Sequence, residues 1–192
     1  MLAIGTANPT NSIPQDKYAD WYFRVTKSEH LANLKEKMKK ICLNSGIKKR
    51  YLLHTEDTIR DHPELAVHDQ PSLNVRQDIL AAAMPELVAE AAARAIAEWG
   101  RPTSDITHVV FTSYSGLLIP RADLRLVTLL GLRRSVQRTA MNYLGCSSAA
   151  AALCVAKDIA GNNHGARVLV AGAEFSLMLF RAPQEDHIEN RF

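Results

Sequence analysis

The chain has 192 residues, a formal net charge of +3, 47% hydrophobic residues and 22% charged residues, which is the balance of a soluble globular protein with one domain or two small ones. The charge is too small to indicate nucleic acid as a partner, and no apolar run has the length of a membrane span. The N-terminus lacks a signal-peptide pattern and the three cysteines lack framework spacing, so we expect a cytoplasmic protein.

The first half of the chain is predicted to be mainly helical. The sequence favours a strand at 1–6, helices at 14–26, 28–45 and 74–99, and a short strand at 51–54. Ser28 fits the N-cap of the second helix and Gly46 its stop. Residues 55–73 are polar and interrupted by proline, so we expect a loop there. Pro85 should kink the third helix or split it in two.

Strands and helices alternate in the second half. We expect strands at 108–112, 137–143 and 167–172, another strand that begins at 177–180, and helices at 122–130 and 147–160. This alternation predicts an α/β layer architecture.

The stretch MNYLGCSSAAAALCVAKDIA places Cys146 where a strand gives way to an alanine-rich helix. A helix N-terminus lowers the pKa of a thiol and presents backbone N–H groups to an oxyanion. The small residues after the cysteine would let this helix lie deep in a core. Two alternatives stay open: a nucleophile that forms a thioester, or a buried cysteine that packs as a small hydrophobe, which Ala150 and Cys154 at helical spacing favour.

Seven basic residues gather within sixteen positions, from Lys35 to Arg50. They form either a surface for the phosphates of a carrier such as coenzyme A or a solvated helix face, and the residues alone favour the second. The GxxxxGK[ST] and GxGxxG motifs do not occur. We expect no metal site, because no two histidines have metal-ligand spacing, and we expect His54, His62 and His68 to face solvent.

Several stretches resemble, in collinear order, the plant type III polyketide synthases of the chalcone and stilbene synthase family. They are IGTANP (4–9), LKEKMKKIC (34–42), IKKRYLLHTE (47–56), PSLNVRQDI (71–79), AIAEWGRPTSDITHVVF (95–111), LLGLRRSVQR (129–138), the run 145–174 and FRAP (180–183). Residues 1–192 thus resemble the N-terminal domain of that family, without its C-terminal half. The resemblance implies an α/β, thiolase-like fold: a layered mixed sheet with a buried helix after the nucleophilic cysteine. A thiolase or an initiating ketosynthase fits these stretches less well.

The resemblance also implies an activity and a set of site residues. The family is a homodimeric acyltransferase of flavonoid and phenylpropanoid biosynthesis that needs no cofactor. A starter acyl group moves from an acyl-CoA to Cys146, and decarboxylative condensation with malonyl-CoA follows. Lys37 and Lys40 fall where the family binds coenzyme A. The substrate-pocket positions are Tyr114, Ser115, Ile119, Ser176 and Leu179, of which Ile119 reaches into the partner subunit and the last two belong to a strand.

The sequence departs from the family at several of these positions. Tyr114 and Leu179 replace typical threonines, Ser147 replaces a common phenylalanine, and Asn44 stands at a third basic position. We therefore expect a less polar cavity, closer to the alkylresorcinol or curcuminoid type than to chalcone synthase. The family's catalytic His and Asn lie in its second half, so we expect this chain alone to have little or no synthase activity. The alternative is an inactive truncated relative, a fragment or a regulatory partner that forms a heterodimer with a full-length synthase.

Overall fold

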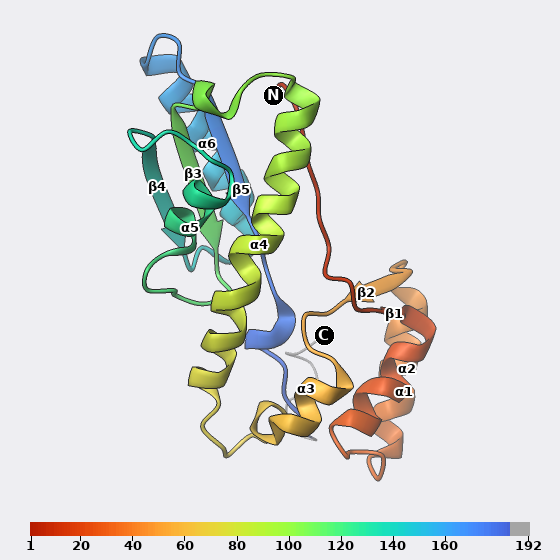
Figure 1. Cartoon of the computed structure of the whole chain (residues 1–192). Helices are drawn as coiled ribbons and strands as arrows, with labels where there is room; N and C mark the ends of the chain where they lie inside the picture. The colour runs from red at the N-terminus through yellow and green to blue at the C-terminus, as the bar shows by residue number, and fades with distance from the viewer. Residues whose placement is uncertain (185–192) are drawn as a thin grey trace. The chain divides into compact units, whose positions relative to one another are not determined.

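The computed structural model describes residues 1–184, and the chain divides into two compact units (Figure 1). The first unit contains Met1–Asn8 and Gln77–Glu174. The second contains Pro9–Arg76 and the chain from Phe175 onward. Each unit is therefore assembled from two segments that are far apart in the sequence.

The first unit is built on a parallel sheet of three strands in the order β4-β3-β5. Its strands are β3 (His108–Ser113), β4 (Gln137–Asn142) and β5 (Val168–Gly172). The central strand β3 is buried along its whole length, as the apolar run HVVFTS predicts for a parallel strand covered on both faces. The α/β prediction is thus confirmed. The expected mixed character is not found in this sheet, because each of its connections returns through a helix and keeps the strands parallel.

Three helices accompany the sheet: α4 (Leu73–Trp99), α5 (Ala122–Leu129) and α6 (Ser148–Asn162). Met84 of α4 and Ala122 of α5 lie around Phe111 of β3. Pro85 does not split α4, which runs as one helix in Figure 1. Leu80, Met84 and Val88 are spaced one turn apart and are buried on one face of the helix. Their packing stabilises α4 at Pro85, which has no N–H to donate to the preceding turn.

Helix α6 packs against β3 and β5 with one face only. Ala152 is fully buried on that face, whereas Leu153 remains 50% exposed and Cys154 is also exposed. The prediction of a helix buried deep in a core is therefore wrong for this chain. The small residues do allow close packing on the sheet, but within residues 1–184 only one side of the helix is covered.

The first residues do not form the expected strand. The Ile4 N–H donates to the Glu98 carboxylate (3.1 Å), and the Arg94 guanidinium donates to the Thr6 carbonyl (2.6 Å). Both partners lie on α4, so the backbone of this segment bonds to helix side chains and not to a strand. A Cβ on Gly5 would lie 2.0 Å from the Ala91 carbonyl oxygen, so only glycine permits this close approach.

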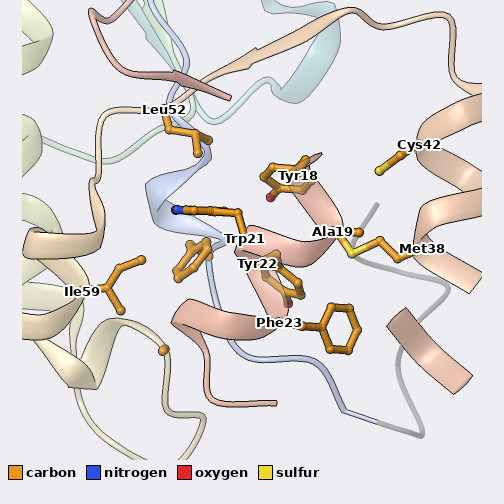
Figure 2. Packing of buried hydrophobic residues seen from close by; sticks show 11 residues of the cluster. Tyr18, Ala19, Trp21, Tyr22, Phe23, Met38, Cys42, Leu52 and Ile59 are labelled. Carbon is orange, nitrogen blue, oxygen red and sulfur yellow. The ribbon is translucent and has the colours of Figure 1, made fainter. Parts of the chain in front are cut away.

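In its described residues, the second unit contains a small antiparallel ribbon and three helices. Its elements are β1 (Ser12–Pro14), α1 (Gln15–Val25), α2 (Ala32–Asn44), β2 (Lys49–Tyr51) and α3 (Glu56–Asp61). The core is a cluster of aromatic side chains from α1 against Met38 and Cys42 of α2 (Figure 2). Helix α2 begins four residues later than predicted, since the Ser28 N–H and hydroxyl instead bond to the carbonyls of Phe23 (2.8 Å) and Thr26 (3.1 Å).

Three details of the second unit correct the sequence analysis. The expected loop at 55–73 contains α3, whose first turn is closed by a reciprocal capping box between Thr55 and Thr58, and the short 3-10 turn Pro63–Leu65. The strand expected from Leu177 is a 3-10 turn, Ser176–Met178, and Arg76 donates to its Leu177 carbonyl. The reason is that Leu177 and Phe180 give their carbonyls to the buried Arg76 guanidinium instead of a neighbouring strand.

His54 does not face solvent. Its side chain is 0% exposed, and its ring centre lies 4.4 Å from that of Phe180 and 6.0 Å from that of Trp21. Within residues 1–184 neither ring nitrogen has a hydrogen-bond partner. Burial lowers the pKa of His54 to about 4. The prediction that His54 faces solvent was wrong because the aromatic residues that enclose it come from distant segments.

Candidate thioester site

The carboxyl ends of the three parallel strands bring three short segments of the first unit together. In the sheet register Ser113 pairs with Asn142, and Thr112 pairs with Gly172. The Tyr143 N–H donates to the Ser113 carbonyl (3.2 Å) and extends this pairing by one residue. Residues 113–115, 143–146 and 173–174 therefore leave the same edge of the sheet, the usual place for a site in an open parallel α/β layer.

Cys146 lies in the 3-10 turn Gly145–Ser147, directly before α6. Tyr143 and Gly145 have left-handed φ values of 61° and 63°, and they turn the chain from β4 into the helix. Cys146 is exposed, so it does not pack as a buried hydrophobe in this chain. The Ser147 hydroxyl donates to the Leu144 carbonyl (3.0 Å) instead of capping α6, which leaves the first N–H groups of the helix without a side-chain cap beside the thiol.

Glu174 fastens the turn at 113–115 to the end of β5. Its carboxylate accepts from the Tyr114 N–H at 3.1 and 3.0 Å and from the Ser115 hydroxyl at 2.8 Å. The Ser113 hydroxyl donates to the Ala173 carbonyl (2.9 Å) and accepts from the Ser115 N–H (3.0 Å). Sequence reasoning missed Glu174. The available signal was a lone carboxylate two residues after the apolar strand VLVAG.

Tyr114 is half-buried at the edge of this turn. Burial raises the pKa of its phenol, and the nearby negative charges of Glu174 and Cys146 raise that pKa further. The phenol therefore stays protonated at neutral pH and keeps its capacity to donate a hydrogen bond.

The other expected site residues are distributed between the two units. Ile119 belongs to the first unit and is 88% exposed. Ser176 and Leu179 belong to the second unit and are exposed in and after the 3-10 turn, not on a strand. Lys37 and Lys40 are exposed on α2 of the second unit.

The basic helix α2 uses two of its lysines for structure. The Lys35 and Lys39 ammonium groups lie 2.8 and 3.3 Å from the Asp20 carboxylate on α1. These ion pairs hold the Asp20 carboxyl pKa below its usual value, mainly through the bond from Lys35. Lys35 and Lys39 thus join α1 to α2, whereas Lys37 and Lys40 occupy other positions on the helix.

Residues 1–184 contain no group of three or more His, Cys, Asp or Glu side chains arranged to hold a metal ion. In the same described part of the chain, no helix combines the length and the apolar character needed to cross a bilayer.

An exposed thiol before a helix N-terminus, at the carboxyl edge of a parallel sheet, is the arrangement of a thiol-dependent acyl-transfer site. The family model described as "Chalcone and stilbene synthases, N-terminal domain" matches residues 1–191, and the chain belongs to this family. It is 56% identical over 185 residues to a "Bisdemethoxycurcumin synthase" of Oryza sativa subsp. japonica. The match covers 96% of this chain and 46% of that relative, so the chain spans about half the length of the curated relative it matches.

These comparisons confirm the resemblance to the N-terminal part of a plant type III polyketide synthase. They also support, by family, an enzyme of the acyltransferase class.

Proposed function

We propose that this chain carries the acyl-accepting site of a type III polyketide synthase, with Cys146 as the nucleophile. The observation that supports this role is the exposed Cys146 thiol in the turn that leads into α6. The Cys146 thiolate attacks the carbonyl carbon of an acyl-CoA, a new C–S bond forms, and the thiolate of coenzyme A leaves. The first N–H groups of α6 have no side-chain cap, and free donors of this kind would stabilise the oxyanion that this step creates.

The remaining chemistry belongs to the whole synthase. Malonyl-CoA loses CO₂, and the resulting carbanion attacks the thioester carbonyl and releases the Cys146 sulfur. This sequence needs acyl-CoA and malonyl-CoA as substrates and no prosthetic group. Lys37 and Lys40 would hold coenzyme A phosphates, a role that suits two exposed cations three residues apart on one helix.

The substrate pocket is of the curcuminoid or alkylresorcinol type in this proposal. At two pocket positions where the family commonly has threonine, this chain has the aromatic residue Tyr114 and the apolar residue Leu179. The similarity to a relative named for bisdemethoxycurcumin agrees with this choice. A full-length form that released only naringenin chalcone would contradict it.

The chain alone should have little synthase activity and should act as a homodimer or with a full-length synthase. The outer face of α6, where Leu153 is half exposed, supports a state in which further polypeptide covers this helix. The alternative function is that of an inactive fragment or regulatory partner that binds a full-length synthase near Ile119 and β4. The 88% exposure of Ile119 favours such a contact.

The test is the intact mass of the purified chain after incubation with aromatic and fatty acyl-CoA esters. We expect one acyl adduct that Cys146→Ala removes and Cys154→Ala preserves. Cys154 is the matched control, because it is exposed on the helix that directly follows Cys146. An adduct that persists in Cys146→Ala, or no adduct with any ester, would contradict the acyl-accepting role of this chain.

A further inference from the structure

We propose that the amino edge of the parallel sheet is a docking surface for an acidic segment of a partner protein, which Arg133, Arg134 and Arg167 recognise. These three residues, the amino-edge arginines, belong to the first unit and lie before the strands begin. Cys146 follows the other end of β4. The inference therefore goes beyond the proposed acyl-accepting role and does not depend on it.

Two loops bring the amino-edge arginines to the same edge of the sheet. In the register, the first residue of β3 lies opposite the first residues of β4 and β5. Because neighbouring strands are about 4.8 Å apart, the starts of β4 and β5 lie about 10 Å apart. Arg167 directly precedes β5, and Arg133 and Arg134 lie in the turn just before β4.

Backbone hydrogen bonds fix these two loops to the residue that precedes β3. The Thr107 N–H donates to the Arg167 carbonyl (2.9 Å), and the Thr107 hydroxyl accepts from the Arg167 N–H (2.8 Å). On the other side, the Gln137 N–H donates to the Thr107 carbonyl (3.0 Å), and the Val136 N–H donates to the Arg133 carbonyl (3.1 Å). The backbone that carries the arginines is therefore already ordered, which lowers the entropy cost of binding a partner.

The amino-edge arginines differ from the other arginines of the first unit because they lack carboxylate partners. Within residues 1–184, no ion pair joins any of the three to an Asp or Glu side chain. Arg133 and Arg134 are exposed, and Arg167 is half-buried. The unit contains eight arginines, and the other five all pair with carboxylates of the same unit: Arg94, Arg101, Arg121, Arg125 and Arg138.

The sequence around the amino-edge arginines carries almost no negative charge. Residues 124–157 and 159–173 contain no Asp or Glu. Asp158, between these stretches, pairs with Lys157, and Asp105 lies 2.7 Å from the guanidinium group of another arginine. The positive field of the amino edge is therefore largely unopposed and attracts an anionic partner.

The residues beside the arginines favour a polypeptide partner over a lipid bilayer. Leu132 and Val136, on either side of the turn, are buried, so residues 131–138 offer no exposed apolar side chain to enter a bilayer. A guanidinium group binds a carboxylate through two parallel hydrogen bonds. A flexible segment rich in Asp and Glu can follow both loops, whereas a net charge of +3 is small for a nucleic-acid surface.

The position of the docking surface leaves the candidate thioester site open. Strand β3 has six residues, so the two edges of the sheet are about 20 Å apart. A partner bound at the amino edge does not cover Cys146. Three exposed charge pairs give a weak complex whose formation is accelerated by electrostatic attraction and weakened by salt.

The first experiment measures binding of a fluorescein-labelled oligoglutamate peptide to the whole chain by fluorescence anisotropy. We expect binding that weakens severalfold between about 25 and 150 mM NaCl, because the Debye length falls to about 8 Å. The triple variant Arg133→Ala, Arg134→Ala, Arg167→Ala should raise Kd by about tenfold. Each exposed ion pair changes affinity by about two- to threefold, and three are lost.

The matched control removes three exposed cations that already have carboxylate partners: Arg60→Ala, Arg125→Ala and Lys157→Ala. It lowers the net charge by the same amount, and we expect Kd to stay within about twofold of the parent value. Equal weakening in both triple variants would overturn the proposal, because net charge alone would then explain binding. Absence of binding by the parent at low salt would overturn it as well.

The second experiment locates the peptide with a photo-crosslinking group at its end. We expect adducts in residues 131–138 and 163–168. Adducts confined to α2, with binding lost in Lys37→Ala, Lys40→Ala instead, would overturn the proposal. So would binding of the parent to phosphatidylserine vesicles through the amino-edge arginines without binding of the peptide, since the partner would then be a membrane. No acyl-CoA is used, so failure of the proposed function would leave this result unaffected.

Discussion

Replacing His54 by leucine should make the second unit less sensitive to mild acid. The His54 ring is completely buried against Phe180 and Trp21, and both of its nitrogens lack hydrogen-bond partners in the described part of the chain. Protonation would place a cation in this aromatic cluster. Leucine fills a similar apolar volume and cannot titrate.

The magnitude follows from the pKa difference between the folded and unfolded chain. Burial lowers the His54 pKa from 6.5 to about 4, so the unfolded chain binds a proton more readily than the folded chain. The contribution of neutral His54 to stability is therefore fully present above pH 6.5 and is lost as the pH falls through about 4. At about 1.4 kcal/mol per pKa unit, this loss is on the order of 3 kcal/mol.

The assay is urea unfolding followed by Trp21 fluorescence between pH 4 and 7.5, in a Trp99→Phe background. Trp21 lies 6.0 Å from His54 and both belong to the second unit, so the signal reports on the titrating site. The parent should lose about 3 kcal/mol of unfolding free energy across this range through His54. The His54→Leu variant should lose that much less. Equal pH dependence in both proteins would refute the reasoning.

Three further substitutions test other contacts. Arg76→Met should lower the unfolding free energy of the second unit by about 3 kcal/mol, measured by Trp21 fluorescence, because buried carbonyls lose a charged donor. Gly5→Ala should free the first residues from α4 and speed their removal by limited proteolysis, since the new Cβ would meet a helix carbonyl at 2.0 Å. Asp123→Asn should destabilise the first unit by about 3 kcal/mol in chemical unfolding, as two arginines 3.0 and 2.8 Å away would lose a buried carboxylate. An unchanged unfolding free energy in Arg76→Met or Asp123→Asn, or an unchanged proteolysis rate in Gly5→Ala, would contradict the corresponding contact.

The sequence predicted correctly those helices and strands whose signal lies within their own residues. Helix α1 and strands β3 and β4 lie within a residue of their expected bounds, and Cys146 lies at the expected start of a helix. In each case the signal is contained in the segment itself, as hydrophobic periodicity or as a run of small residues.

The errors occur where distant residues decide the structure. His54 is enclosed by Trp21 and by Phe180, which lies more than a hundred positions later. The carbonyls of Leu177 and Phe180 accept from the Arg76 guanidinium, and this segment does not extend a sheet. Glu174 was missed for the same reason, because its partners come from the turn after β3, about sixty residues earlier. No local window of sequence contains these pairings.

The alternation of segments between the two units has a consequence for synthesis on the ribosome. The chain passes from one unit to the other between Asn8 and Pro9, between Arg76 and Gln77, and between Glu174 and Phe175. The aromatic cluster of the second unit lacks Phe180 until residues 77–179 have been translated after Arg76. A nascent chain that has passed Arg76 therefore carries an incomplete aromatic core while the sheet of the first unit is being made. Such an intermediate is a candidate for chaperone binding. The time at which the aromatic core is completed depends on translation more than on local folding rates.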